Sequence, residues 1–221
     1  MFLKTYSPVL NFPKNYCWPF QNRQKGGLTG IIERMGSFER VKEEIKKILP
    51  NSPIEFDPVH SELVLKNLLK LKPDADEAFQ IAALGHDIDR AVHKITEKDL
   101  TDFSKIDEFK KQHSLRSAKI VADILKKYGY DEKFVQKVSH LIENHEFGLD
   151  EDSRLLMDAD SLAYFEYNIP FYLKRNGRER TKEKIKFMYI RMSEKTKRVV
   201  DKMTFDDGEI AKLFKETIYG L

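Results

Sequence analysis

The sequence predicts an all-α protein, and two observations carry this prediction. Apolar residues recur at the 3.6-residue spacing of a helix from residue 37 onward, beginning with Phe38, Val41 and Ile45. Alternating apolar and polar runs, the pattern of a half-buried strand, are nearly absent from the 221 residues. We therefore expect one helical domain over residues 37–221, preceded by an irregular N-terminal arm over residues 1–36.

Start and stop signals define the first helices of this domain. Pro50 ends the first helix because proline cannot continue the hydrogen-bond ladder. A second helix begins with Asp57 as its N-cap and Pro58 in its first turn. Asp74 is expected to cap a third helix, which carries the motif LGHDIDR.

The same signals divide the rest of the chain. A YGY turn ends the fourth helix, Asp131 caps the fifth, and an Asn-Gly pair separates the sixth from a long basic helix. The helices expected after the third cover residues 107–127, 131–146, a stretch from about 153, a basic stretch that includes Thr181–Arg198, and 209–219.

Composition excludes several classes of protein. The net charge is only +3, and no apolar stretch approaches the roughly 20 residues that span a bilayer, so no membrane partner is expected. The single cysteine, Cys17, excludes an intrachain disulfide and any cysteine-rich zinc site. The first twenty residues lack the apolar core of a signal peptide. The cytoplasm is the expected location.

Positive charge is concentrated in one segment. Between Lys174 and Arg198 there are eleven Lys or Arg residues against three Glu. One interpretation is a solvated helix held by ion pairs four residues apart, and the other is attraction for phosphate or nucleic acid. No recognised nucleic-acid readout motif accompanies the charge. Composition leaves both interpretations open, and nucleic acid stays open as a partner.

Four of the six histidines are predicted to point into the protein. His60, His86, His113 and His145 share helical faces with apolar residues on four different helices, whereas His140 faces water. In the segment MDADSLAYF, Asp160 lies on the apolar face and Asp158 on the opposite one. Burying so many ionisable groups without compensation costs several kcal/mol for each group. A metal centre removes that cost, and its nitrogen and oxygen ligands suit Fe, Mn, Co, Ni or Zn.

The order of these residues resembles a known superfamily. His60, the doublet His86-Asp87 and Asp160 are similar to the motif of the HD-domain metal-dependent phosphohydrolases, over about residues 55–170. The resemblance implies a helical bundle with a metal site in its core, in which these four residues bind one ion. LMDADSLAYF resembles the ADxL element of the superfamily, whose aspartate corresponds to Asp160.

Two further segments resemble the binuclear branches. HSLRSA, beginning at His113, and IENHEFG, which contains His145, are similar to elements whose histidines hold a second metal. The spacing from His145 to Asp160 is similar to the corresponding spacing in the bacterial diadenosine tetraphosphatases of this superfamily. The resemblance thus implies one or two divalent transition-metal ions, with Fe or Mn favoured over Zn, Co or Ni.

The activity implied is hydrolysis of a phosphorylated small molecule, expected to be a nucleotide or another small phosphoester. Asp87 would coordinate metal and span the centre as a catalytic residue. Arg90 stands where family members carry a basic residue, so it is expected to be the second catalytic residue and to bind substrate phosphate. The alternative is a surface salt bridge with Asp89. The remaining expected substrate-binding residues, which could close over a polyanion, are Lys174, Arg175, Arg178 and Arg180.

Two other functions stay open at this point. Mixed-valent diiron oxygenases use the same six-ligand HD pattern, so ligand identity alone does not distinguish them from hydrolases. A non-catalytic module that senses a nucleotide is the second alternative. The sequence predicts neither the substrate's identity nor the oligomeric state.

Overall fold

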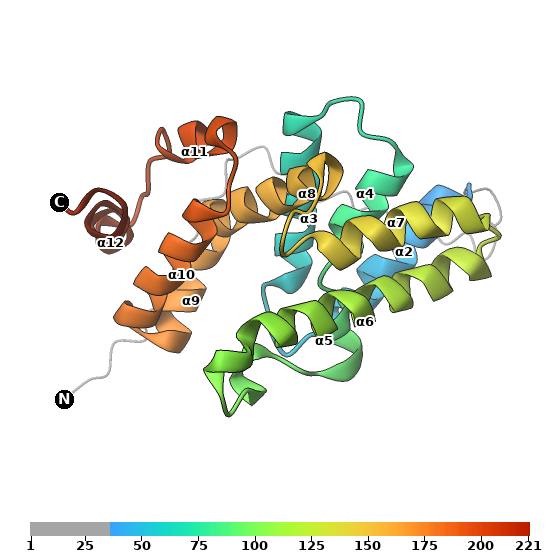
Figure 1. The fold of residues 1–221 in the computed structure, drawn as a ribbon, viewed down its shortest axis with the longest axis horizontal. Helices are drawn as coiled ribbons and strands as arrows, with labels where there is room; N and C mark the ends of the chain where they lie inside the picture. Colours follow the sequence, from blue (N-terminus) through green and yellow to red (C-terminus); the bar gives the residue numbers. More distant parts are fainter. Residues whose placement is uncertain (1–35) are drawn as a thin grey trace, which may run out of the picture. The chain divides into compact units, whose positions relative to one another are not determined.

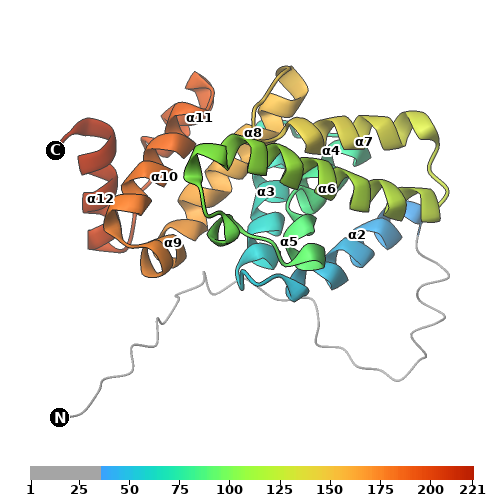
Figure 2. The same cartoon turned by 60° about the horizontal axis from the view of Figure 1, so that its bottom comes forward.

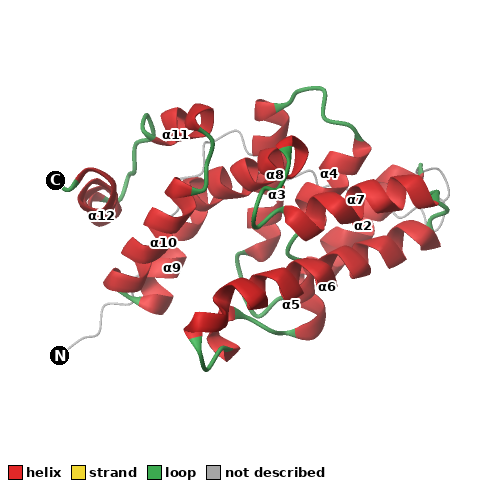
Figure 3. Ribbon diagram, in the orientation of Figure 1, coloured by secondary structure: helices red, strands yellow, loops and turns green. Residues whose placement is uncertain are grey.

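The computed structural model describes residues 36–221, and within them every regular element is a helix (Figures 1 and 3). The predicted all-α class is confirmed for this part of the chain. The described residues form one compact unit. The predicted N-terminal arm, with Cys17, lies outside the described residues except for Gly36. The α-helices are α2 (Ser37–Ile48), α3 (Asp57–Leu71), α4 (Glu77–Gly85), α5 (Ile88–His93), α6 (Ile106–Lys127), α7 (Glu132–Asn144), α8 (Glu151–Ala163), α9 (Ile169–Asn176), α10 (Arg178–Ile190), α11 (Glu194–Val200) and α12 (Gly208–Tyr219).

The helices form two groups that meet at α8. Helices α2–α7 pack together as a bundle, and α9–α12 lie at one end of it in both views (Figures 1 and 2). A π-helical turn, Tyr164–Asn168, carries the chain from α8 directly into α9. Such turns are rare and occur mostly at functional sites. Helix α8 therefore belongs to both groups and connects the bundle to the basic C-terminal helices.

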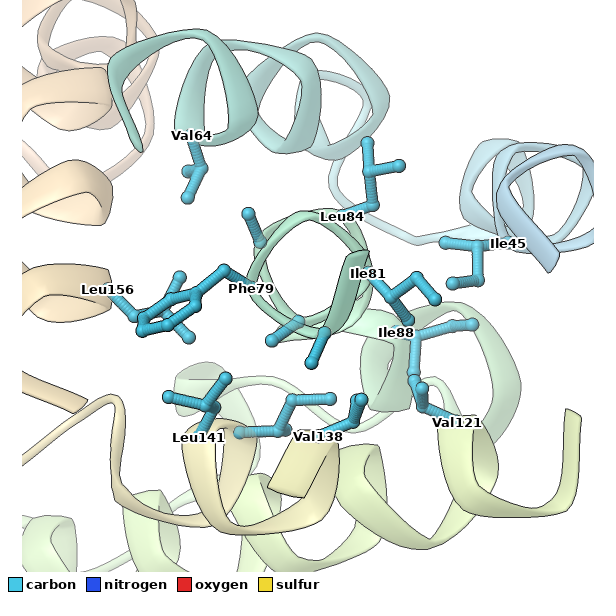
Figure 4. Close-up of a cluster of buried hydrophobic side chains, with 14 of the residues drawn as sticks. Ile45, Val64, Phe79, Ile81, Leu84, Ile88, Val121, Val138, Leu141 and Leu156 are labelled. Carbon is cyan, nitrogen blue, oxygen red and sulfur yellow. The ribbon is translucent and has the colours of Figure 1, made fainter. Parts of the chain in front are cut away.

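Helix α4 lies at the centre of the first core. Figure 4 views it end on, with Val64 of α3, Leu156 of α8, Leu141 of α7 and Ile45 of α2 arranged around it. The buried alanines of α4 allow neighbouring helices to approach closely. At Gly85 the approach is closest, since a Cβ built there would lie 2.6 Å from Val121 Cγ2.

A second core joins the C-terminal helices to α8. It is built from aromatic and aliphatic side chains of α8, the π-helical turn, α9, α10 and α12, with Phe165, Ile185 and Phe214 among its buried members. Asp158 adds a polar connection to α11. Its carboxylate accepts hydrogen bonds from Ser193 N at 2.9 Å and Thr196 Oγ1 at 2.8 Å. Asp158 thus points away from Asp160, as predicted, but it is also buried.

Three predicted helix boundaries are wrong. Asp57 is the first residue of α3 and not its N-cap, which is Phe56, because the Asp57 carboxylate accepts from Ser52 Oγ at 2.6 Å and not from a backbone N–H of the helix. The cap of α4 is Asp76 instead of Asp74, because the Asp76 carboxylate accepts from Phe79 N at 3.2 Å. The long basic helix expected over Thr181–Arg198 is divided into α10 and α11. Ser193 starts α11 as an N-cap. The contact with Asp158 holds that cap in place, which periodicity along the chain could not reveal.

Other predicted boundaries agree with the structure. Asp131 caps α7 by accepting from Phe134 N at 2.8 Å, and α6 ends at Lys127 before the YGY turn. Within residues 36–221 no helix combines the length and apolarity required to cross a membrane.

Candidate metal centre

Six buried side chains from five parts of the bundle meet at one end of α4. They come from α3, the junction of α4 and α5, α6, the end of α7, and α8, and none is more than 8% exposed. These are the residues predicted as metal ligands: His60, His86, Asp87, His113, His145 and Asp160.

The histidine ring nitrogens face the two carboxylates. His60 Nε2 lies 3.0 Å from Asp160 Oδ1, and His86 Nε2 lies 3.9 Å from the same oxygen. Asp87 turns one oxygen to each of two histidines, with Oδ2 3.4 Å from His86 Nε2 and Oδ1 2.7 Å from His113 Nε2.

These side chains could bind metal in two overlapping groups. Ligand atoms of His60, His86 and Asp160 lie within 4.8 Å of one another, and so do those of His86, Asp87 and His145.

A break in the helix lets the adjacent His86 and Asp87 face the same point. Neighbours in a continuous helix diverge by about 100° around its axis. Here α4 ends at Gly85 and α5 begins at Ile88, so the doublet lies between two helices. Asp87 has φ −108° and ψ 11°, outside the helical region. The chain turns at the doublet, and both side chains reach the centre.

The second ring nitrogen of each histidine also has a partner. The carbonyl oxygen of Ala83 lies 2.9 Å from His86 Nδ1, and that of Ile142 lies 2.7 Å from His145 Nδ1. Because Nδ1 donates to a carbonyl, Nε2 is left as the lone-pair nitrogen. His86 Nε2 is buried and has no hydrogen-bond partner. An unpartnered nitrogen among carboxylates and imidazoles fits a metal ion.

Charges in the centre shift several pKa values. Burial alone would lower the pKa of His86, but the carboxylates of Asp87 and Asp160 outweigh it and raise the pKa to about 9. A metal ion at Nε2 would therefore displace a proton from this ring. Burial lowers the pKa of His145 to about 4. Burial opposes ionisation of Asp160, yet Arg191 and His60 keep its pKa well below the usual range. The carboxylates are therefore charged at neutral pH, as metal ligands must be.

A pocket of about 110 Å³ reaches this centre. His60, Asp87 and Asp160 form part of its wall, so three of the candidate ligands face it. We call this cavity the metal pocket. Four carboxylates line it together with six cationic residues: Arg90, Lys98, Arg175, Arg180, Lys184 and Arg191.

The metal pocket includes only some of the predicted substrate-binding residues. Arg90, Arg175 and Arg180 line it, whereas Lys174 and Arg178 do not. Arg178 instead binds Glu216 at 2.6 Å.

Lys98, Lys184 and Arg191 are pocket residues that the sequence reasoning missed. Lys184 and Arg191 are seven residues apart, or two helical turns, so they share a face of the basic segment. That spacing is a signal that could have found both residues.

Two arginines bind the candidate metal-ligand carboxylates directly. Arg90 forms ion pairs with Asp87 and, at 3.4 Å, with Asp57. Arg191 binds Asp160, and its Nη1 lies 3.0 Å from Glu146 Oε2. The surface pair considered between Arg90 and Asp89 does not form among the described residues, because Asp89 is buried with other partners.

Asp89 is a buried part of the centre that sequence reasoning did not identify. It is 0% exposed, and its Oδ2 lies 3.0 Å from His113 Nδ1. Arg116 binds the same carboxylate through Nε and Nη2, both at 2.9 Å. His93 Nδ1 is 2.6 Å away on the other oxygen. Asp89 therefore orients the His113 ring from behind. By contrast His140 is exposed and pairs with Asp150.

Comparison with known proteins identifies a family but no characterised relative. No curated protein and no solved structure matches the chain. The family model described as Domain of unknown function (DUF4202) matches residues 40–213. That match covers most of the chain, which therefore belongs to the DUF4202 family.

Proposed function

We propose that this protein is a metal-dependent phosphohydrolase acting on a nucleotide or another small phosphoester. One observation carries the proposal: a buried, unpartnered His86 Nε2 lies in a His/Asp cluster, and three members of that cluster line a pocket with six Lys and Arg residues. The resemblance of His60, His86-Asp87 and Asp160 to the HD-domain superfamily supports it.

The six residues would hold two metal ions. His60, His86, Asp87 and Asp160 would bind the first, and His113, His145 and Asp87 the second. Asp87 supports this division because its two oxygens face different histidines, Oδ2 toward His86 and Oδ1 toward His113. A bound divalent metal supplies a Lewis acid for the phosphoryl oxygens and lowers the pKa of a water toward neutrality.

The charge of the metal pocket fits a phosphoryl group. Bound metal ions would neutralise the ligand carboxylates of Asp87 and Asp160. The other acids in the lining are then Glu97 and Glu146, against six Lys and Arg residues. Arg175 and Arg180 have guanidinium groups that bind phosphate oxygens in pairs. Water occupies about 30 Å³ per molecule, so a cavity of about 110 Å³ has the size of one phosphate group. The rest of the substrate would lie outside it.

Arg90 and Arg191 are suited to hold charge and not to move a proton. Burial works against both cations, but Asp87 for Arg90 and Asp160 for Arg191 raise the pKa of each guanidinium above its usual range. Each therefore stays protonated through the reaction. Fixed cations of this kind stabilise the negative charge that develops on a phosphoryl group and its leaving oxygen.

The test is hydrolysis by the full chain, purified without a metal-affinity tag and supplied with Mn²⁺ or Fe²⁺. We expect release of phosphate from p-nitrophenyl phosphate or from a nucleotide. Asp87→Asn should lower kcat by at least about a hundredfold, because the carboxylate would no longer join both ligand groups. The exposed His140→Ala variant is the matched control. A metal-loaded protein that hydrolyses no phosphoester would overturn the proposal.

A further inference from the structure

A second cavity lies beside the metal pocket, between α6, α8 and α10. Its volume is about 610 Å³, in the range of sites for small organic molecules. We call it the flanking pocket. Glu146 and Arg191 line both cavities, so the two pockets meet at this ion pair. A molecule with one end at the metal centre could therefore extend into the flanking pocket.

Lys110 supplies a buried positive charge to the flanking pocket. The residue is 5% exposed, and its ammonium lies 3.5 Å from the centre of the Phe187 ring. The facing carboxylate oxygen, Glu146 Oε2, is 3.7 Å away, beyond hydrogen-bond distance. Lys110 makes no hydrogen bond to any residue of the described part of the chain. An ammonium has three donors, and leaving them without acceptors costs free energy. An anion in the pocket would supply the acceptors.

The surroundings of Lys110 favour an anion. Desolvation lowers the pKa of Lys110 to about 8, so the group is still mostly charged at neutral pH. Inside the pocket, Lys110 and Arg191 face the single carboxylate of Glu146. The other acids of the lining, Asp107 and Glu194, stand at exposed positions. Two cations of the interior thus face one carboxylate of this lining, and Arg191 is also bound by Asp160.

The walls of the flanking pocket are apolar and partly aromatic. Phe187 is 37% exposed and Phe147 is 42% exposed, a large exposure for this residue type. Met157 and Met192 also line the cavity. Aromatic rings and thioether groups pack well against a flat ring. An anionic group and a flat ring are thus the two features that this pocket would recognise.

We propose that the flanking pocket binds the nucleoside phosphate part of a nucleoside polyphosphate, with the base against Phe187 and Phe147 and a phosphate on Lys110. The terminal phosphoryl group would then enter the metal pocket across the Glu146–Arg191 pair. This inference names the substrate class and rests, for the hydrolysed group, on the proposed function. In hydrolysis a water oxygen bonds to the terminal phosphorus. The bridging P–O bond breaks with its electron pair on the nucleotide, and the water proton passes to solvent.

Binding of a non-hydrolysable nucleotide tests the proposal on the full chain. Adenosine 5′-(α,β-methylene)diphosphate is titrated by calorimetry and compared with inorganic phosphate, which has no base to pack against Phe187 and Phe147. We expect the nucleotide to bind at least tenfold more tightly than phosphate. Lys110→Met keeps the apolar stem of the side chain and removes its charge. It should weaken nucleotide binding at least tenfold and weaken phosphate binding less, because inorganic phosphate can still bind in the metal pocket. Lys111→Ala, at the exposed neighbouring position, is the control and should bind like the wild type.

Phe187→Leu is the second variant, and it keeps the test decisive if Lys110→Met does not fold. Loss of the ring should weaken nucleotide binding but not phosphate binding. Nucleotide binding equal to that of phosphate, or unchanged in both variants, would overturn the proposal. The binding measurement does not require hydrolysis, so it can contradict the nucleotide site without testing the proposed phosphohydrolase activity. If the protein binds the nucleotide through Lys110 but hydrolyses no phosphoester, the result supports the nucleotide site in the flanking pocket and contradicts the proposed phosphohydrolase activity.

Discussion

Asp89 Oδ2 lies 3.0 Å from His113 Nδ1, on the side of the ring opposite the Nε2 that faces Asp87. The same carboxylate is bound twice by Arg116, so its position is fixed independently of the metal centre. Carboxylates behind metal-binding histidines hold the ring in one orientation and one tautomer. Asp89 is therefore a positioning residue for His113.

Replacing Asp89 with Asn should weaken binding of the second proposed metal ion and leave binding of the first unchanged. The amide cannot accept from both Arg116 and His113 as the carboxylate does, so the His113 ring loses its orientation. We expect affinity for the second metal to fall about 10- to 100-fold, with the first metal retained. Metal content per chain after dialysis measures this loss. The control is Asp123→Asn, at an exposed position of α6. Equal metal content in both variants would remove the positioning role.

Adding a methyl group at Gly85 should destabilise the fold. In Gly85→Ala the new Cβ would lie 2.6 Å from Val121 Cγ2, and Val121 is fully buried, so α4 and α6 must move apart. Overpacking of this kind costs about 1–3 kcal/mol. Chemical denaturation measures the free energy of unfolding. Gly208→Ala is the matched control, because no atom lies within 4 Å of the Cβ built there. A Gly85→Ala variant as stable as the control would contradict the described packing.

The neighbouring arginines Arg178 and Arg180 should differ in their effect on substrate binding. Arg180 lines the metal pocket, whereas Arg178 binds Glu216 on α12. Arg180→Ala should raise KM for a phosphorylated substrate by about tenfold, because that factor corresponds to the binding free energy of one charge-assisted hydrogen bond. Arg178→Ala should leave KM near the wild-type value. The reverse order in steady-state kinetics would show that the pocket is not where substrate phosphate binds.

Acid should remove a small contribution of Asp150 to stability. Hydrogen bonds from the Ser153 backbone and from His140 lower the pKa of Asp150 to about 2 in the folded protein. A lowered folded-state pKa stabilises the fold above the ordinary pKa of about 4. That stabilisation disappears as the pH falls through about 2.

The difference in unfolding free energy between wild type and Asp150→Asn should therefore shrink from pH 5 to pH 2. It should stay below about 1 kcal/mol, since much of the side chain is exposed. Asp152→Asn, at an exposed position on the same helix, is the control. A difference that is constant over this pH range would contradict the assignment.

The inward faces of the helices were predictable from sequence because helical periodicity is local. His60, His113 and Asp160 lie on the buried side of their helices, as their spacing indicates. The turn between α4 and α5 was not predicted, because no proline or turn-forming pair interrupts LGHDIDR, yet α4 ends at Gly85 and α5 begins at Ile88. Periodicity therefore identifies which residues are buried, and the turn determines that His86 and Asp87 reach the same point.

Partners from distant segments could not be predicted. The division of the basic segment into α10 and α11 depends on Asp158, which lies 35 residues before Ser193 in the chain. Arg191 is the C-cap of α10, and it reaches Asp160 because α10 and α8 contribute to the same second core. Local patterns give the charge of such segments, and tertiary packing determines which of these charges enter the site.

Metal content per chain tests the central claim most directly. Full-length protein purified without a metal-affinity tag is analysed by elemental mass spectrometry, beside His86→Ala and the double variant His113→Ala/His145→Ala. We expect close to two transition-metal ions in the wild type and one in the double variant, which keeps the ligands of the first ion. His86→Ala should also hold about one, because His113, His145 and Asp87 remain for the second ion. A folded wild-type protein that retains no metal under any loading condition would contradict the account.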